Sequence, residues 1–359
     1  MNTVLTIIEF IIAIGILAFL HELGHFLAAR LCKIEIEEFG FGFPPRMARL
    51  FSLGGTEFTI NWIPFGAFVK PKGENNPDVP GGLAAAKPWP RMAVLFGGPI
   101  MNLLAGVLFF SIISTVWGGP DSSQALIAGV TSGFPAEKAG LRACDVVVSV
   151  NSEAVDGTEK LRSLIQKNPN TEVDLSFLRD GQTLQTRATP IIPSGETKAR
   201  LGIIISNPFK PVVWYKSIPL AFQTTYLQIR ELLLMPIRMI QGTIPPEQGR
   251  VVGIVGMGNI YEQIINRDQS QQLPCLPPAG MYDRLTLLAT ISIALGITNL
   301  FPLPALDGGR IVFVLPELLF KKRVPAKYEN LVHSIGFILL IILMIVITTQ
   351  DIINPVMLP

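Results

Sequence analysis

The residues of this chain with the clearest chemistry lie in one short stretch, His21-Glu22-Leu23-Gly24-His25, which has the pattern H-E-x-x-H. Two histidines four residues apart lie on one helix face, about 5–6 Å from each other, so both imidazoles can reach one tetrahedral zinc. The glutamate between them projects beside such a metal and can take a proton from water there. The whole chain has only three histidines. The stretch therefore predicts a catalytic zinc site with His21 and His25 as ligands and Glu22 as general base.

A catalytic zinc needs a third protein ligand and an open coordination position. Asp307 is the candidate, because it follows an apolar stretch that Pro302 and Pro304 must break. Non-helical backbone at membrane depth is tolerated only against protein or a water-filled cavity. Asn299, just before the prolines, can hydrogen-bond a substrate backbone or an oxyanion. Asp-Gly is also a common turn pair, so position alone leaves a turn role for Asp307 open.

Composition places these residues in a membrane protein. Hydrophobic residues make up 49% of the 359 residues and charged residues only 16%, whereas soluble domains are about 25% charged. The formal net charge of +2 is too small to indicate nucleic-acid binding. Four stretches are apolar over about the 20 residues that a bilayer requires, namely 4–20, 92–117, 285–301 and 331–349. The first has no basic amino-terminal region and no small-residue cleavage site, so we expect a retained span.

The distribution of Lys and Arg predicts the orientation of these spans. The loop after the first span carries eight basic residues, and the loop between the third and fourth spans carries five. Both loops are therefore expected in the cytoplasm, with both termini and the segment 118–283 outside. This predicts a multi-pass protein of a bacterial cytoplasmic membrane, with its active site near the cytoplasmic side.

Residues 121–207 differ in character from the apolar stretches. Short runs rich in Val and Ile alternate with turn signals, among them Arg179-Asp180-Gly181, and residues 156–166 have a helical pattern. We expect a compact, mostly β, extracytoplasmic domain here.

The segment that follows predicts less regular structure. Residues 214–241 are amphipathic, which favours a helix on the membrane surface or packed in a core. Residues 241–279 are rich in Pro, Gly and Gln, and we expect a return to the third span that consists mostly of loop. The three cysteines are widely spaced and odd in number, so we expect neither a zinc pair nor a disulfide framework.

One short stretch alternates apolar with polar residues. Phe58, Ile60 and Trp62 alternate with Thr59 and Asn61, as in a half-buried strand with its apolar side chains inward. A strand edge near the zinc can pair with an unwound substrate segment by β-addition. The three apolar residues are therefore candidate substrate contacts, with an ordinary cytoplasmic hairpin as the alternative.

Together, these motifs resemble the site-2 protease family of intramembrane zinc metalloproteases, in particular its bacterial regulator-of-sigma-E-protease branch with four spans. The resemblance rests on HELGH in the first span, NxxPxPxLDGG after the third, and the β domain between the second and third. It implies zinc as cofactor, held by His21, His25 and Asp307. It also implies Glu22 as general base and Asn299 as a substrate contact.

Further segments are similar to the same family. Residues 39–43 and 54–70 look like its membrane-reentrant β-hairpin. Residues 97–102 resemble its GGPxxN pattern, for which we expect a role in close helix packing because small residues let helices approach.

Residues 121–207 resemble a single PDZ domain. Cys144 and Ser152 stand where glycine is usual, and this departure concerns the shape of two loops. The resemblance implies a peptide-binding loop formed by Leu201, Gly202 and Ile203. Whether the groove binds a peptide or only filters substrates by size stays open at this point.

The expected fold is a polytopic α-helical membrane protein with four transmembrane helices, a membrane-associated β-hairpin and an inserted PDZ domain. Its expected segments are 1–118 with the first two spans and the hairpin, 121–207 with the PDZ domain, 208–283 with the amphipathic helix and loop, and 284–359 with the last two spans.

The expected activity is zinc endoproteolysis within the membrane. The family implies single-span membrane proteins as substrates, such as anti-sigma factors or remnant signal peptides. We expect contact with membrane lipid and none with nucleic acid. One alternative is a PDZ scaffold with structural zinc, but such a site would not need Glu22. The other is a small transporter, for which the sequence lacks an evident inverted repeat.

Two isolated ionisable residues stand outside these motifs. We expect His333, one turn into the fourth span on the cytoplasmic side, to be a hydrogen-bonded histidine at the membrane interface, with support of the metal site as the alternative. We expect Glu9, in the first span, to extend toward the lipid headgroups.

Overall fold

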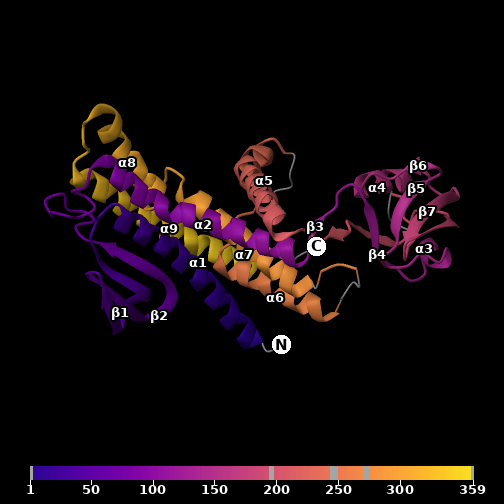
Figure 1. Cartoon of the computed structure of the whole chain (residues 1–359), viewed down its shortest axis with the longest axis horizontal. Coiled ribbons are helices and arrows are strands. Elements are labelled where there is room, and N and C mark those ends of the chain that lie inside the picture. Colours follow the sequence, from indigo (N-terminus) through magenta and orange to yellow (C-terminus); the bar gives the residue numbers. More distant parts are fainter. Residues whose placement is uncertain (1–2, 194–197, 243–249, 271–274, 278, 357–359) are drawn as a thin grey trace. The chain divides into compact units, whose positions relative to one another are not determined.

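The chain forms two compact units in this computed structural model, which describes residues 3–193, 198–242, 250–270, 275–277 and 279–356. The first unit comprises Met1–Ser111, Ile218–Ile265 and Arg284–Pro359. The second comprises Ile112–Ser217 and Asn266–Asp283. Figure 1 shows the helices and hairpin of the first unit and the small sheet of the second.

The first unit is a helical bundle with one β-hairpin. Its helices lie wholly or mainly within it and are α1 (Thr3–Leu31), α2 (Pro88–Val116), α5 (Trp214–Ile240), α6 (Ile254–Ser270), α7 (Ala279–Asn299), α8 (Asp307–Phe320) and α9 (Ala326–Ile353). Four of them, α1, α2, α7 and α9, are long and apolar enough to cross a membrane, as predicted. Helix α1 continues past the predicted end of the first span at Leu20, so HELGH lies inside the helix.

The hairpin of β1 (Ile36–Leu53) and β2 (Thr56–Pro71) folds back on itself. Phe39 pairs with both Val69 and Phe58, so the start of β1 lies between the two halves of β2. The curled sheet that results leaves the last residues of β2 at one edge, and this edge packs along α1.

The expected burial of this hairpin is wrong. Thr59 and Asn61 are buried, whereas Ile60 and Trp62 are 37% and 64% exposed. The inward polar side chains have local partners: the Thr59 hydroxyl donates to a Glu38 carboxylate oxygen at 2.7 Å, and Asn61 Nδ2 donates to a backbone carbonyl. Outward apolar side chains are expected where the surroundings are themselves apolar.

A helix replaces much of the loop expected over 241–279. Helix α6 buries Tyr261, Ile264 and Ile265, and Tyr261 and Ile265 pack against Phe10 of α1. The buried Asp351 carboxylate, at the end of α9, accepts hydrogen bonds from two backbone N–H groups at the start of α6, both at 2.9 Å. The apolar residues recur at helical spacing, but the Gly and Gln between them concealed the pattern.

Glu9 has a partner on another helix, and its expected extension toward the lipid headgroups stays a prediction. Its carboxylate lies 3.6 Å from the Arg284 guanidinium of α7. An ionisable group inside an apolar span is costly without such a partner.

The second unit contains an antiparallel sheet in the order β8-β7-β5-β4-β9, with β6 paired to β5. Its elements are β3 (Gly119–Pro120), β4 (Ala125–Val130), α3 (Pro135–Lys138), β5 (Val146–Val150), β6 (Glu153–Ala154), α4 (Thr158–Lys167), β7 (Val173–Arg179), β8 (Gln182–Ala188), β9 (Ile203–Ser206) and β10 (Phe209–Lys210). The predicted Arg179-Asp180-Gly181 turn joins β7 to β8. Ile127, Leu161 and Phe177 contribute to one hydrophobic core.

Two loops of this unit keep the shape that glycine usually permits. Cys144 and Ser152 have φ angles of +79° and +62°, a region that costs a non-glycine residue about 1–2 kcal/mol. At Cys144 a further bond holds the loop, because its sulfur forms a disulfide with Cys275. We expected no disulfide framework from the spacing of the cysteines, and this one disulfide was missed because a separation of 131 residues gives no indication of proximity in space.

The disulfide predicts a simple labelling pattern. In protein purified without reductant and then denatured, a thiol-alkylating reagent should modify only Cys32, whereas prior reduction should expose three thiols. Mass spectrometry of the intact chain reads the number of adducts. The variant Cys275→Ser should carry two adducts without reduction, and three adducts on the unreduced native chain would contradict the pairing.

Candidate metal centre

The centre is built on a very close crossing of α1 and α2. A Cβ atom added at Gly24 would lie 2.2 Å from the carbonyl oxygen of Gly97, and one added at Gly97 would lie 2.5 Å from the carbonyl oxygen of Gly24. Only glycine allows two backbones to approach so closely. Gly97, the first glycine of the GGPxxN segment, therefore has the expected role in close helix packing.

The third side chain comes from the break between α7 and α8. Pro302 and Pro304 end the helical run, because proline cannot donate the backbone hydrogen bond that a continuous helix needs. Helix α8 then starts at Asp307 directly against this segment. A Cβ at Gly308 or Gly309 would lie 2.2 Å from a carbonyl oxygen of the segment, which explains the two glycines after the aspartate.

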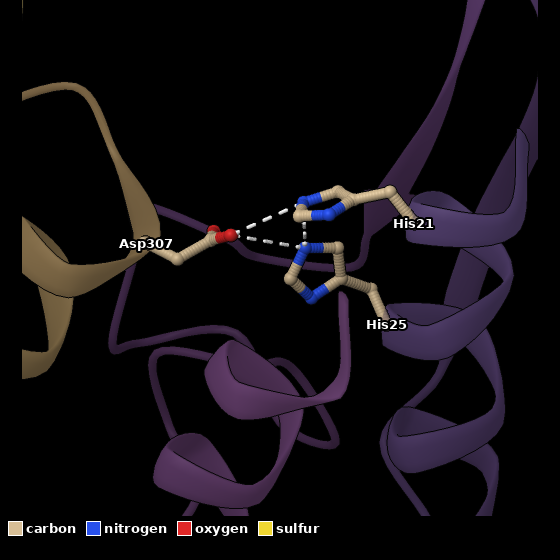
Figure 2. Close-up of side chains that lie close together, drawn as sticks. All are labelled: His21, His25 and Asp307. Atoms are coloured by element: carbon tan, nitrogen blue, oxygen red, sulfur yellow. Dashed lines mark hydrogen bonds and ion pairs between the residues drawn. The ribbon is translucent and has the colours of Figure 1, made fainter. Parts of the chain in front are cut away.

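Three potential ligand atoms converge at this place. Nε2 of His21 lies 3.2 Å from Oδ2 of Asp307, and Nε2 of His25 lies 3.4 Å from the same oxygen. The two Nε2 atoms are 3.1 Å apart. Figure 2 shows both imidazoles projecting from α1 toward the carboxylate. Among the described residues, these form a group of His, Asp, Glu or Cys side chains close enough to share one metal ion.

The convergence fits a tetrahedral metal. Ligands at about 2.0–2.1 Å from a zinc ion lie about 3.3–3.4 Å from one another, close to the separations in this cluster. His25 donates from Nδ1 to the carbonyl oxygen of Val94 at 2.8 Å, so its Nε2 has a lone pair. Burial raises the pKa of the Asp307 carboxyl, but contacts with His21 and His25 outweigh burial and hold this pKa below its usual range. A metal cation bound between these donor atoms would stabilise their close approach.

Glu22 and Asn299 line the same cavity, which has a volume of about 280 Å³. Oε2 of Glu22 accepts a hydrogen bond from the backbone N–H of Val69 at 3.1 Å, so β2 orients this carboxylate. Asn299 ends α7, and its Nδ2 donates to the Leu295 carbonyl at 3.0 Å. The structure thus brings together the five residues that the two sequence motifs singled out, whose chemical roles remain predictions.

Asn102 also belongs to this site, although its pattern predicted packing alone. It lies on α2 and is 1% exposed, and its carboxamide is 3.1 Å from Nδ1 of His21. Gly98, one helical turn earlier, faces the imidazoles: a Cβ there would lie 2.3 Å from Nε2 of His25. The sequence did contain a signal for this role, because Asn102 is a carboxamide inside a span that has no charged residue.

His333 supports the segment that carries Asp307. Its Nδ1 accepts a hydrogen bond from the backbone N–H of Ala305 at 2.9 Å, and Ala305 has a left-handed φ of +73°. Gly336 packs against Pro304, because a Cβ there would lie 2.2 Å from the proline Cβ. The expected hydrogen bond of His333 is therefore present, and it holds the chain two residues before Asp307. Its place at the membrane interface stays a prediction.

The other predicted contacts lie elsewhere. Phe58, Ile60 and Trp62 do not line the cavity, whereas Phe68, Val69 and Pro71 at the end of β2 do. Leu201, Gly202 and Ile203 line a cavity of about 570 Å³ in the second unit, next to α4.

Comparison with known proteins gives the chain its family. Residues 9–343 match the family model described as Peptidase family M50. This chain belongs to peptidase family M50. The assignment makes the protein a metalloprotease that uses zinc and is integral to the membrane, and it confirms the family resemblance of the sequence motifs.

This M50 peptidase has relatives along nearly its whole length. It is 29% identical to a Clostridium acetobutylicum protein provisionally named a zinc metalloprotease, over 96% of this chain and 97% of that one. It is 25% identical to metalloprotease MmpA of Caulobacter vibrioides, over 96% of this chain and 94% of that one. Among solved structures, the PDZ domain of an SdrC-like protein from Listeria monocytogenes matches 23% of this chain and 87% of that chain, with 14% identity and a TM-score of 0.22.

The space at Gly98 gives a prediction for this M50 peptidase. Gly98→Ala places a methyl group among the imidazole nitrogens, so we expect bound zinc and peptidase activity to fall at least tenfold in a folded protein. Zinc per chain and cleavage are the measurements. The matched control is Gly258→Ala on α6, where the nearest atom is 3.5 Å away. Normal zinc and activity in Gly98→Ala would contradict the geometry.

The hydrogen bond of His333 gives a second prediction. His333→Ala leaves the N–H of Ala305 without this partner, which costs about 1–3 kcal/mol. We expect activity to fall about tenfold or more, because 1.4 kcal/mol corresponds to about a factor of ten. His333→Gln keeps an acceptor and should recover part of the loss. The exposed neighbour Ser334→Ala is the control, and unchanged activity in His333→Ala would count against this role.

Proposed function

We propose that this M50 peptidase is an intramembrane zinc endopeptidase that cuts transmembrane segments of single-span membrane proteins. One observation carries the proposal: His21, Glu22 and His25 lie within an apolar, span-length helix and share one cavity with Asn299 and Asp307. A peptidase whose reactive groups lie inside a membrane helix acts on polypeptide that enters the membrane. Anti-sigma factors and remnant signal peptides are the substrate classes that we propose, in line with the family resemblance.

The proposed roles follow from the donor atoms. His21, His25 and Asp307 would hold the metal, which supplies Lewis-acid activation of water and of the scissile carbonyl when bound. Glu22 is the proposed general base, which takes a proton from the attacking water and gives it to the departing amine. The Val69 N–H keeps the Glu22 carboxylate facing the cavity. Asn299 is a proposed contact for the substrate backbone or the developing oxyanion.

Substrate presentation is proposed to use the hairpin. The end of β2 lies at a sheet edge and lines the cavity through Phe68 and Val69, so an unwound substrate segment can add to it as a strand. Unwinding matters because a helix keeps its carbonyls hydrogen-bonded. We assign Phe58, Ile60 and Trp62 to contacts with flanking apolar parts of the substrate. Ile60 supports this role, because with Phe19 of α1 it lines an apolar cavity of about 380 Å³.

We propose that residues 121–207 form a PDZ domain that binds an extended peptide. Strand β9 pairs on one side with β4, and beside its other edge a cavity is lined by Leu201, Gly202 and Ile203 together with Ile165 of α4. Gly202 has a φ of +79°, and a Cβ there would collide with Phe134. A free strand edge beside a helix suits strand addition.

For the chain outside the PDZ domain, we propose the division into the segments 1–118, 208–283 and 284–359.

The proposed location is a bacterial cytoplasmic membrane, with the metal centre toward the cytoplasm and the PDZ domain and both termini outside. The basic loops support this orientation. So does the disulfide between Cys144 and Cys275, because disulfides persist outside the reducing cytoplasm.

The direct test compares the native chain with Glu22→Gln on a panel of single-span model substrates in detergent. We expect Glu22→Gln to bind zinc normally and to lose cleavage by about a hundredfold or more, as for removal of a general base. The control is Glu37→Gln, an exposed carboxylate paired with Lys70. Equal cleavage by Glu22→Gln and the native chain would refute the role of Glu22, and absence of zinc from a folded native chain that never met a chelator would refute the metal centre.

A further inference from the structure

We propose that Asn102 is a positioning residue: its carboxamide oxygen accepts the Nδ1–H of His21 and thereby directs the lone pair of Nε2 to the metal. This inference rests on the proposed role of His21 as a zinc ligand. It assigns to the second membrane helix a part in metal binding that neither motif of the predicted ligand set contains.

The position of Asn102 supports a single, fixed hydrogen bond. The residue is 1% exposed, so bulk solvent does not reach its carboxamide. The backbone carbonyl of Asn102 accepts a hydrogen bond from the Ser292 hydroxyl of α7 at 2.8 Å, so the backbone and the carboxamide of this residue have different partners. The carboxamide itself lies 3.1 Å from Nδ1 of His21, and Oδ1 is buried without a hydrogen-bond partner among the described residues.

His25 shows what a metal ligand needs on its second nitrogen. Its Nδ1 faces the carbonyl oxygen of Val94 at 2.8 Å, and a carbonyl can only accept a hydrogen bond. The proton of a neutral imidazole must therefore be on Nδ1, and Nε2 has a free lone pair. The backbone of α2 thus selects the metal-binding tautomer of His25.

In the part of the chain that the structure describes, the partner of Nδ1 of His21 is the Asn102 carboxamide and not a backbone carbonyl, so the tautomer of His21 depends on Asn102. As the carboxamide stands, Nδ2 faces Nδ1 of His21. When the Asn102 amide donates to Nδ1 of His21, Nδ1 must be without a proton. The proton of the neutral imidazole is then on Nε2, the atom that faces His25 and Asp307. A nitrogen that carries a proton cannot bind zinc.

A half-turn of the carboxamide reverses this pairing and frees Nε2 of His21 for the metal. The oxygen and nitrogen of an asparagine side chain are nearly equal in size and exchange places on this rotation. Oδ1 then accepts a hydrogen bond from Nδ1–H of His21, and Nδ2 takes the buried place that Oδ1 leaves. Partners of this kind orient ligating imidazoles in metalloproteins, and their removal costs about 10–100-fold in metal affinity.

The test measures zinc affinity of full-length protein by competition with a chromogenic chelator. Asn102→Leu keeps the approximate size but has no acceptor, and Asn102→Ala removes the group without added bulk. We expect both to weaken zinc binding about 10–100-fold. Asn102→Asp retains an acceptor and should remain within a few-fold of the native affinity. Ser292→Ala is the matched control, because it removes the neighbouring buried hydrogen bond without contact to His21.

The outcomes separate this inference from the proposed function. Native zinc affinity in a folded Asn102→Leu or Asn102→Ala would overturn the role of Asn102. An equal loss in Ser292→Ala would also overturn it, because helix packing alone would then explain the effect. If the native chain binds zinc and His21→Ala binds it equally well, the ligand role of His21 fails instead.

Discussion

The contact on which the rest of this structure depends is the crossing of α1 and α2 at Gly24 and Gly97. Each glycine lies so close to the carbonyl of the other that a single added methyl group would overlap it. The contact brings Val94, Gly98 and Asn102 of α2 beside the imidazoles of α1. Without it, a His-x-x-x-His pair would face lipid, where buried polar groups are expensive.

Polar groups inside the bundle are stabilised by partners from a second or third helix. His25 is held by a carbonyl of α2, and the carbonyl of Asn102 is held by Ser292 of α7. At the start of α2, the buried Arg91 guanidinium pairs with Glu317 of α8 at 2.7 Å. Breaking a buried ion pair leaves an unpaired charge, so this contact fixes α8. The same helix begins at Asp307, so its placement bears directly on the metal centre.

Much of this arrangement was accessible from the sequence because the deciding signals are local. The spacing of His21 and His25, the length of the apolar stretches and the two prolines before Asp307 each follow from geometry over a few residues. The Arg179-Asp180-Gly181 turn was predicted for the same reason.

The errors and omissions concern contacts between distant residues. Nothing in the spacing of Cys144 and Cys275 indicates that they meet, and nothing near His333 indicates that it binds the N–H of Ala305. Ile60 and Trp62 point outward, as expected for a strand in apolar surroundings. The rule that apolar side chains point inward assumes that the strand is surrounded by water. Helix α6 was missed because glycine and glutamine obscured its apolar spacing. Asn102 was assigned to packing, since its partner lies on another helix.

The central claim is that two imidazoles and one carboxylate from three places in the chain hold one zinc ion. X-ray absorption at the zinc edge of the purified full-length protein tests it most directly. The account predicts a first shell of nitrogen and oxygen at about 2.0–2.1 Å, with outer-shell scattering from two imidazoles that falls to one in His21→Ala. A sulfur shell at about 2.3 Å, or a spectrum without imidazole scattering, would contradict it.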